Sequence, residues 1–282
     1  MTKKLSIITI NYNDKLGLQK TINSVINQSW QDFEYLVIDG GSNDGSAALI
    51  QDNKRIDYSI SEKDSGVYDA MNKGIKVAKG EYLLFLNSGD FLVNETVLSQ
   101  VFNKLDGKAS IYYGNLFYSN KGKRTLLWTP PAELSFSYFL NNSLPHPASF
   151  IKKDLFFKYF LYNESLKIIS DWEFFIYCIC KMNEKYQHLD IVISDFDDSG
   201  LSSRKENLQK ITVEKQEVLK NIFPLFYQDT KMIQEFQSKR VKHFMYLKSN
   251  KLKWKLLKGF MNLLLISESK KQIGTVNNYT KI

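Results

Sequence analysis

Cysteine and histidine are both scarce in this chain. The 282 residues include two cysteines, Cys178 and Cys180. They stand two positions apart in a segment with helical periodicity, where their side chains point away from each other, so we expect no disulfide between them. The three histidines, His146, His188 and His243, lack zinc-motif spacing. This composition suits a reducing compartment, and we predict a cytoplasmic protein.

Several other sequence signals are missing. No apolar run reaches the roughly 18 residues that a membrane-spanning helix needs. Residues 1–4 lead directly into a β-like run, so we expect no secretory signal. The glycine fingerprint of dinucleotide-binding folds, the phosphate-binding P-loop and the Gly-x-Ser-x-Gly elbow are also absent, which disfavours those enzyme classes.

Acidic residues are scarce in the C-terminal part, although the chain as a whole carries a net charge of +8. Residues 201–282 hold 17 Lys and Arg against 6 Asp and Glu, whereas residues 1–200 hold 21 against 24. A near-neutral body thus precedes a basic tail, and this asymmetry indicates an anionic partner for the tail.

Aromatic residues, by contrast, are abundant, with 16 Tyr and 19 Phe. Aromatic faces bind sugars and bases, and they also fill hydrophobic cores. Both interpretations stay open from composition alone.

Short apolar runs alternate with helical patterns in the first part of the chain. The predicted strands are 5–10, 33–38, 56–60 and 81–86, and the predicted helices are 15–28, 47–51 and 66–79. This alternation is typical of βαβ units, so we predict an α/β fold with a mostly parallel central sheet and helices on both faces.

The pattern changes after residue 110. Strands are predicted at 110–118, 148–151 and 188–194, a helix at 170–182, and a helical, basic extension at the C-terminus. We therefore predict a catalytic domain over 1–205, with halves 1–109 and 110–205, and a basic helical region over 206–282.

Polar residues follow three of the first four strands. The loops that begin at Asn11, Asp39 and Asn87 are rich in Asp, Asn, Ser and Gly. In open α/β sheets, ligands bind at the carboxyl ends of the strands, so these loops predict a ligand site.

Individual residues in these loops allow two interpretations each. Asp39 could accept a hydrogen bond from a nucleotide base while Gly40 leaves room for a flat ring, or it could be a turn or helix-capping aspartate. Asp64 could likewise cap the helix that follows it. Asp69 and Asn72 share one helical face, which could line a pocket or face solvent.

The turn Asn87–Asp90 follows the most apolar strand. Asp90 offers hard oxygens that suit Mg²⁺ or Mn²⁺ bound together with a diphosphate. An ordinary β-turn fits the same four residues equally well.

Four motifs in order carry a family resemblance: Asn11–Asn13, Asp39–Ser46, Asp64–Gly74 and Gly80–Asp90. Together they resemble the family 2 glycosyltransferases of GT-A fold, a Rossmann-like fold, and most of all the bacterial members that build colanic-acid-like, capsular or lipopolysaccharide chains. The resemblance covers residues 4–205 and is most specific over 4–90. It implies inverting transfer from a UDP- or GDP-sugar to a saccharide or polyprenyl-linked glycan in cell-surface polysaccharide biosynthesis.

The resemblance also implies the donor site. The first-strand loop and Asp39 would hold the base, and the region from Asp64 to Gly66 would lie near base and ribose. The implied donor-binding residues are Ile10, Asn11, Tyr12, Asn13, Asp39, Gly40, Asp64, Gly66, Asp69, Asn72, Asn87 and Ser88. The family's metal-binding Asp-x-Asp motif matches Asn87–Asp90, where Asn87 replaces the first acid. The resemblance thus implies a divalent cation, Mn²⁺ or Mg²⁺, with Asp90 as its ligand.

The implied catalytic base is Asp171, in the segment Ser170–Glu173, with Glu173 as a reserve. Such a carboxylate removes the proton from the acceptor hydroxyl as it attacks the anomeric carbon. Trp172 would stack on a sugar or fill the core.

Three further residues resemble acceptor- or diphosphate-side positions of the family. His146, between two prolines, would contact acceptor or diphosphate, or serve as a structural turn residue. Ser199 and Ser202 match a late segment that closes over the diphosphate.

The basic tail contains an amphipathic helical pattern over 248–264. Lys248, Lys251, Lys255 and Lys258 share one face, and leucines with Phe260 share another. This pattern predicts peripheral contact with the anionic inner surface of a bacterial membrane. A helix docked on the catalytic domain or on a second copy is the rival interpretation. Nucleic acid is not an expected partner, and the oligomeric state is open.

Two other functions are compatible with parts of the sequence. A sugar nucleotidyltransferase would show a glycine-rich, basic loop after its first strand, which Asn11–Asp14 does not provide. A catalytically weakened relative acting as a membrane-associated assembly subunit is favoured by Asn87 and opposed by the carboxylates at Asp39, Asp64, Asp90 and Asp171.

Overall fold

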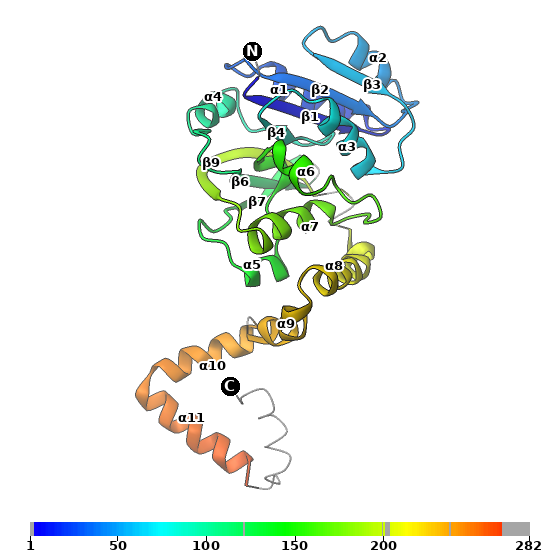
Figure 1. The fold of residues 1–282 in the computed structure, drawn as a ribbon. Coiled ribbons are helices and arrows are strands. Elements are labelled where there is room, and N and C mark those ends of the chain that lie inside the picture. The colour runs from blue at the N-terminus through cyan, green and yellow to red at the C-terminus, as the bar shows by residue number, and fades with distance from the viewer. Residues whose placement is uncertain (1–2, 121, 199, 201–203, 237, 267–282) are drawn as a thin grey trace. The chain divides into compact units, whose positions relative to one another are not determined.

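The computed structural model describes residues 3–120, 122–198, 200, 204–236 and 238–266. The chain divides into two compact units, residues 1–227 and residues 228–282. The strands of the described chain belong to the first unit, and the second unit is helical (Figure 1).

One sheet forms the centre of the first unit. Its strands are β1 (Leu5–Asn11), β2 (Glu34–Asp39), β3 (Tyr58–Ser61), β4 (Tyr82–Phe85), β5 (Phe91–Leu92), β6 (Ile111–Asn120), β7 (Lys123–Trp128), β8 (Ser149–Lys152) and β9 (Tyr186–Asp197). They are ordered β3-β2-β1-β4-β8-β6-β9-β5, and β7 pairs with β6 outside that path. The pairs β3-β2, β2-β1 and β1-β4 are parallel, which confirms the predicted βαβ organisation.

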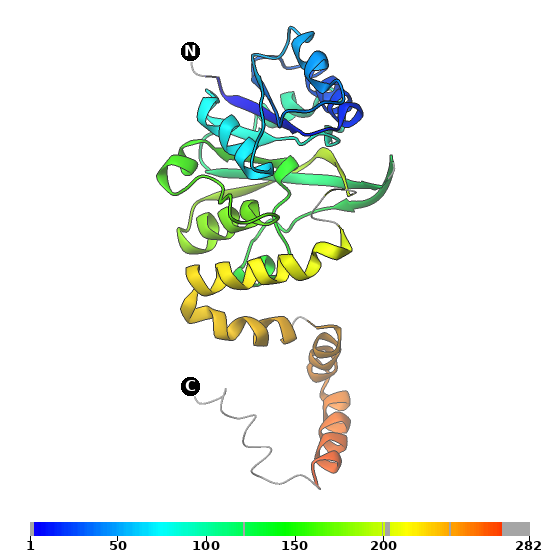
Figure 2. The same ribbon diagram turned by 90° about the vertical axis from the view of Figure 1, so that its right-hand side faces the viewer.

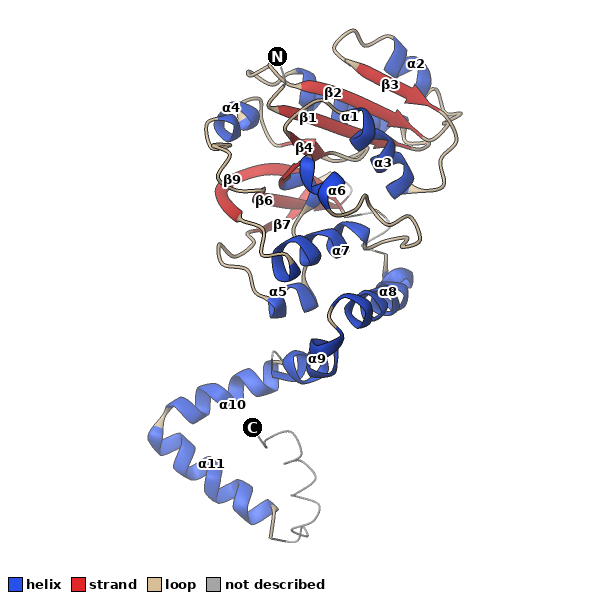
Figure 3. Cartoon of the chain, in the orientation of Figure 1, coloured by secondary structure: helices blue, strands red, loops and turns tan. Residues whose placement is uncertain are grey.

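Helices cover both faces of this parallel part (Figure 3). The helices of the first unit are α1 (Lys15–Ile26), α2 (Ser46–Gln51), α3 (Val67–Val77), α4 (Val97–Phe102), α5 (Phe136–Asn141), α6 (Asp154–Lys158), α7 (Ser170–Ile176) and α8 (Leu208–Ile222). A 3-10 turn, η1 (His146–Ala148), precedes β8, and a π-helical turn, η2 (Tyr177–Lys181), extends α7.

Strand β1 shows why both faces are covered. Ile7 belongs to the core cluster that contains Leu18 and Ile22 of α1. Ile8 lies on the opposite side, so close to α3 that a Cβ on Gly74 would approach its Cγ2 to 2.6 Å. Because neighbouring residues of a strand point to opposite faces, a strand with a helix on each side is apolar almost throughout. All seven residues of β1 are buried.

The second half of the sheet is mixed. The pairs β4-β8, β6-β8, β6-β7 and β5-β9 are antiparallel, whereas β6-β9 is parallel. The predicted parallel character therefore holds for the first four strands and for the β6-β9 pair, and the other pairs of the second half are antiparallel. Periodicity identifies a strand but not its partner, and the elements β5, β7, α4, α5 and α6 were not predicted from the sequence.

The abundance of aromatic residues is largely explained by the core. The largest fully buried side chains are all aromatic and include Trp172, Tyr35, Tyr82 and Phe85. Phe156 and Phe174 stack with ring centroids 4.2 Å apart.

Helix α9 (Pro224–Phe236) crosses the boundary between the two units. The second unit continues with α10 (Lys239–Ser249) and α11 (Lys251–Leu264), neither of which has a buried residue. Over the residues that the structure describes, no helix has the length and hydropathy needed to cross a membrane.

Candidate active site

The carboxyl ends of β1 and β2 meet at Asp39. Its Oδ1 accepts hydrogen bonds from Asn11 Nδ2 at 2.6 Å and Ser42 Oγ at 2.6 Å, and its Oδ2 accepts from Ser61 Oγ at 2.5 Å and the Ser42 amide at 2.9 Å. Burial raises the pKa of Asp39, but these hydrogen bonds outweigh burial and bring the pKa below its ordinary value. Asp39 therefore shapes the loop after β2, as a turn aspartate does, and its contact with a base stays a prediction.

Tyr12 and Asp64 converge on Gly40. A Cβ at Gly40 would lie 2.4 Å from Asp64 Oδ2 and 3.1 Å from the Tyr12 ring, so a side chain here would displace one or both of them. Tyr12 is 67% exposed, and its ring presents a free aromatic face. Burial raises the pKa of Asp64, whose other oxygen accepts a hydrogen bond from the Gly66 amide at 3.0 Å. A ring face and a carboxylate thus flank one glycine, an arrangement suited to a flat nucleotide base.

Hydrogen bonds join the three strand-end loops. Ser88 Oγ donates to Asn11 Oδ1 at 2.7 Å, and the Ser88 amide donates to the carbonyl of Ile10 at 3.0 Å. Asn13 has a positive φ of 50°, and its Oδ1 accepts from the Asn43 amide at 2.9 Å. The predicted donor-side residues of these loops therefore lie together.

Helix α3 contains two predicted donor residues, Asp69 and Asn72, which contact different parts of the chain. Asp69 lies in its first turn, accepts a hydrogen bond from the Ser65 amide at 2.9 Å and lies 3.7 Å from Lys73 Nζ. Asn72 is buried and exchanges two hydrogen bonds with the backbone of Tyr162, at 2.8 and 3.0 Å. Asn72 thus clamps the loop before α7, and it does not line the two pockets described below.

The turn Asn87–Asp90 contains two buried oxygens that have no hydrogen-bond partner in the described part of the chain, Asn87 Oδ1 and Asp90 Oδ2. Gly89 supplies the positive φ of 98° that the turn requires. Burial raises the pKa of Asp90 above its ordinary value, although His146 acts in the opposite direction. A buried carboxylate of this kind is stabilised by a cation.

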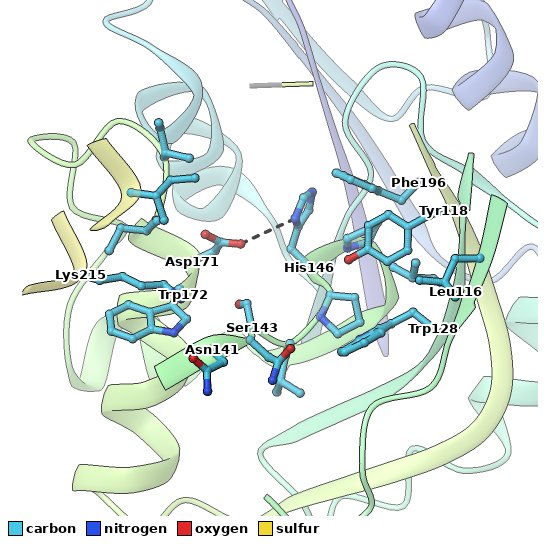
Figure 4. A pocket seen from close by; sticks show the side chains of 18 residues that line it. Leu116, Tyr118, Trp128, Asn141, Ser143, His146, Asp171, Trp172, Phe196 and Lys215 are labelled. Carbon is cyan, nitrogen blue, oxygen red and sulfur yellow. Dashed lines mark ion pairs between the residues drawn. The ribbon is translucent and has the colours of Figure 1, made fainter. Parts of the chain in front are cut away.

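His146 lies between the carboxylates of Asp90 and Asp171, and Figure 4 shows its ion pair with Asp171. Its Nε2 is 3.7 Å from Asp90 Oδ2 and 3.1 Å from Asn87 Nδ2, and its Nδ1 is 3.7 Å from Asp171 Oδ2. Burial lowers the pKa of His146, but the two carboxylates outweigh it and raise the pKa above its usual range. The predicted acceptor-side histidine thus connects the Asp90 turn with the candidate base.

Asp171 lies at the start of α7, where its carboxylate is held by Tyr68 of α3. The Tyr68 hydroxyl donates to Asp171 Oδ1 at 3.0 Å, which leaves Oδ2 toward His146. Burial and the nearby Asp171 charge together raise the pKa of Tyr68, so its hydroxyl stays a donor.

The neighbours of Asp171 differ in role. Trp172 is buried and donates from Nε1 to the Phe139 carbonyl at 2.7 Å, so it is mainly a core residue whose ring also lines a pocket. Glu173 is buried, burial raises its pKa, and it lines neither pocket. The geometry therefore favours Asp171 over the reserve candidate.

Two pockets meet at His146 and Asp171. The smaller, of about 160 Å³, is lined by Asn87, Ser88, Asp90, Tyr68 and Lys167 among others. The larger, of about 390 Å³, is lined mainly by apolar and aromatic side chains. Both pockets share Phe196 and Ile168 as well. The Asp171 carboxylate therefore lies where the two pockets meet.

Sequence reasoning missed several of these residues. Tyr68 lies within the motif Asp64–Gly74, which the sequence analysis identified, so a place for Tyr68 in the site could have been suspected. Lys167, Phe196 and Lys215 gave no signal, because their places depend on packing between distant segments. The predicted residues Ser199 and Ser202 lie outside the described residues.

Comparison with known proteins identifies the family of the chain. The family model described as Glycosyl transferase family 2 matches residues 6–166. An uncharacterized glycosyltransferase of Mycobacterium tuberculosis is 34% identical over 208 residues, which cover 72% of this chain and 78% of that protein. The PGL/p-HBAD biosynthesis glycosyltransferase of Mycobacterium bovis is 29% identical over 201 residues, covering 69% and 77%.

Solved structures share the fold at lower identity. S. aureus TarS 1-349 superposes with a TM-score of 0.61 at 19% identity, covering 86% of this chain and 74% of that chain. The mannosyltransferase PcManGT from Pyrobaculum calidifontis, in complex with GDP-Man and Mn²⁺, gives 0.57 at 11% identity, covering 98% and 84%. The predicted GT-A architecture is thereby confirmed. On its sequence motifs, its fold and these matches, the chain belongs to glycosyl transferase family 2 and is a glycosyltransferase.

Proposed function

We propose that this glycosyltransferase uses Asp171 as the base of an inverting transfer from a nucleoside diphosphate sugar. The observation that carries the proposal is the position of the Asp171 carboxylate where the two pockets meet. It would take the proton of an acceptor hydroxyl in the larger pocket as that oxygen attacks the anomeric carbon of a sugar in the smaller pocket. The nucleoside diphosphate would leave from the opposite face of the sugar, which inverts the configuration.

The contacts of Asp171 support this role. Tyr68 holds Oδ1 at 3.0 Å, so Oδ2 would be the oxygen that receives the proton. His146 lies 3.7 Å from Oδ2, so its protonated ring would place a positive charge beside the carboxylate.

The donor would be a UDP- or GDP-sugar. TarS 1-349 has been solved with UDP and with UDP-GlcNAc, and PcManGT with GDP-Man. In this chain the base would lie between Tyr12 and Asp64 over Gly40, and the diphosphate would extend toward Asp90 and Lys167. The ring face and carboxylate at Gly40 suit a base, and Lys167 suits a diphosphate.

A divalent cation, Mn²⁺ or Mg²⁺, fits the Asn87–Asp90 turn. The buried oxygens Asn87 Oδ1 and Asp90 Oδ2, which accept no hydrogen bond from the described residues, are hard donors of the kind that these ions prefer. Groups of three or more His, Cys, Asp or Glu that could hold a metal do not occur among the described residues, so diphosphate oxygens and water would complete the shell. The cation would neutralise the charge on the leaving diphosphate.

The product would be a cell-surface glycan, made on the cytoplasmic face of the membrane. The name of the M. bovis relative, a PGL/p-HBAD biosynthesis glycosyltransferase, supports such a pathway. The tail supports the location, since residues 239–264 contain eight Lys and Arg and no Asp or Glu. On α11, Leu252, Leu256 and Phe260 are exposed. A basic helix with an exposed apolar side suits an anionic bilayer surface.

The test of the proposed reaction compares Asp171→Asn with Glu173→Gln. Each variant would be incubated with a panel of UDP- and GDP-sugars, Mn²⁺ and candidate acceptors, and release of nucleoside diphosphate would be followed. We expect Asp171→Asn to lower kcat by about a hundredfold or more, because general-base catalysis contributes about that factor. Glu173→Gln should retain most of the activity, since Glu173 lines neither pocket.

Donor affinity, measured by thermal shift, should be nearly equal in the parent and Asp171→Asn. Full turnover by Asp171→Asn would show that Asp171 is not the base. If Glu173→Gln loses turnover while Asp171→Asn retains it, Glu173 is the base instead. Release of pyrophosphate from a nucleoside triphosphate would instead identify a nucleotidyltransferase.

A further inference from the structure

The larger pocket combines apolar walls with a single lysine (Figure 4). Leu116, Tyr118, Trp128 and Phe196 supply much of its apolar and aromatic lining. Among the described residues that line it, Lys215 is the one Lys or Arg. A pocket of this composition binds a ligand through apolar contact and one charged interaction.

The position of Lys215 is determined by the packing of α8. The preceding residue, Glu214, is buried and accepts hydrogen bonds from the amides of Lys167 at 2.9 Å and Ile168 at 3.2 Å. Figures 1 and 2 show α8 beside α7 within the first unit. Because its neighbour is anchored in this way, the backbone of Lys215 is fixed beside the pocket, and its side chain is partly buried there.

The ammonium group of Lys215 has an aromatic ring beside it but no ion-pair partner among the described residues. Its Nζ lies over the Trp172 ring, 4.8 Å from the centroid. No carboxylate of the described chain comes within the ion-pair distance of 4.0 Å. Burial lowers the pKa of Lys215 to about 8, with the Asp171 charge acting in the opposite direction. An enclosed ammonium with an aromatic face as its main partner is stabilised further by an incoming anion.

This lysine belongs to the acceptor side. Lys215 lines the larger pocket and not the smaller one, which contains Asp90 and has its own lysine, Lys167. A nucleoside diphosphate in the smaller pocket would therefore be served by Lys167 and the metal-binding turn. The anion that Lys215 binds must come from the other substrate.

We propose that Lys215 binds an oxyanion of the acceptor, a phosphate or a carboxylate, and that the enzyme therefore selects acidic acceptors. This inference rests on the proposed function, because it takes the larger pocket as the acceptor side. The oxyanion would accept hydrogen bonds from the ammonium, while Trp128, Tyr118 and Phe196 contact the sugar face or an apolar group beside it. Lys215 is thus a specificity residue and takes no part in proton transfer.

The test measures binding of three probes that share one alkyl chain: octyl phosphate, octyl glucuronide and octyl glucoside. Titration calorimetry on the full chain would give each dissociation constant below the micelle concentration. We expect one or both anionic probes to bind about ten- to a hundredfold more tightly than octyl glucoside, as charge-assisted hydrogen bonds do. Preference for octyl phosphate would identify a phosphate, and preference for octyl glucuronide a carboxylate.

Three variants decide whether Lys215 is responsible. Lys215→Met keeps the length of the side chain and should abolish the preference, whereas Lys215→Arg should retain it. Lys220→Met removes an exposed lysine from the same helix, outside both pockets, and should leave the preference intact. Equal binding of all three probes by the parent would overturn the proposal, and so would a preference that survives in Lys215→Met.

Failure of this inference can be separated from failure of the proposed reaction. Donor binding, measured by thermal shift with UDP- and GDP-sugars, should be unchanged in Lys215→Met, which also reports that the variant is folded. Loss of donor binding in a folded Lys215→Met variant would place Lys215 on the donor side and overturn the inference. The base role of Asp171 is judged by Asp171→Asn alone and does not depend on the probe results.

Discussion

The two pockets share His146 and Asp171, but the smaller is otherwise lined by the Asn87–Asp90 turn and α3, whereas β6, β7 and α8 contribute to the larger alone. The smaller pocket contains amide and charged side chains, including Asn87, Asp90 and Lys167. The larger pocket alone contains the rings of Trp128 and Trp172 and the ammonium group of Lys215. The contrast indicates that the smaller pocket suits a diphosphate and a cation, whereas the larger pocket suits an apolar or sugar face beside one anion.

The largest expected effect falls on the smaller pocket. Asp90→Ala removes the one carboxylate of the Asn87–Asp90 turn, so activity should drop by about a hundredfold through weaker, metal-dependent donor binding. Titration of Mn²⁺ at several donor concentrations would measure this, with octyl phosphate affinity as the acceptor-side control. If EDTA does not lower the activity of the parent enzyme, the proposed metal site is wrong, and the cation no longer distinguishes the smaller pocket from the larger one.

The next effect concerns the rigidity of the donor side. Asn11→Ala removes a hydrogen bond to the buried, ionised Asp39 and should lower the free energy of unfolding by about 1.5–3 kcal/mol at pH 7. The pKa of Asp39 is lowered by folding, so its contribution is complete above the unfolded pKa of about 4 and is lost as pH falls through the folded pKa. The difference in the free energy of unfolding between parent and variant, measured by urea unfolding, should therefore be smaller in acid than at pH 7.

A matched control for that measurement is Gln19→Ala. This change removes an exposed hydrogen bond to Asn23 and should alter stability by less than about 0.5 kcal/mol. An equal loss in the two variants would mean that the Asp39 network is no stronger than a surface contact.

The third prediction concerns pH and the larger pocket. Because the pKa of Lys215 is lowered to about 8, its positive charge is present below that pH and is lost above it. Binding of a preferred anionic probe should weaken by about tenfold between pH 7 and pH 9. The weakening should be absent in Lys215→Arg, since arginine stays charged throughout. A parallel decline in both proteins would point to a group other than Lys215.

The smallest effect concerns the residue that supports the base. Tyr68→Phe removes the hydroxyl that donates to Asp171, and kcat should fall about fivefold, the value of about one hydrogen bond. Tyr162→Phe is the matched control, because the buried Tyr162 hydroxyl has no hydrogen-bond partner among the residues that the structure describes, and its kcat should be unchanged. Equal kcat values for Tyr68→Phe and the parent would mean that Asp171 is oriented without Tyr68.

Much of the first half of the molecule could be predicted from local patterns. The parallel strands β1 to β4, the helices between them and the clustering of Asn11, Asp39 and Ser88 follow from apolar runs that end in polar turns. Parallel strands bring their carboxyl ends to one edge, so sequence order alone places these loops together. The mixed pairing of β6, β8 and β9 could not be predicted in the same way, because strands of like composition can pair in several orders.

By itself the sequence determined the α/β class, the donor-side loops, the family motifs and the basic character of the tail, because each is encoded by neighbouring residues. The tertiary structure alone decided that Asn72 clamps a loop, that His146 stands between Asp90 and Asp171, and that Lys215 reaches the larger pocket over Trp172. These contacts join segments dozens of residues apart. Their energy comes from burial and charge in the assembled core, which no local pattern records.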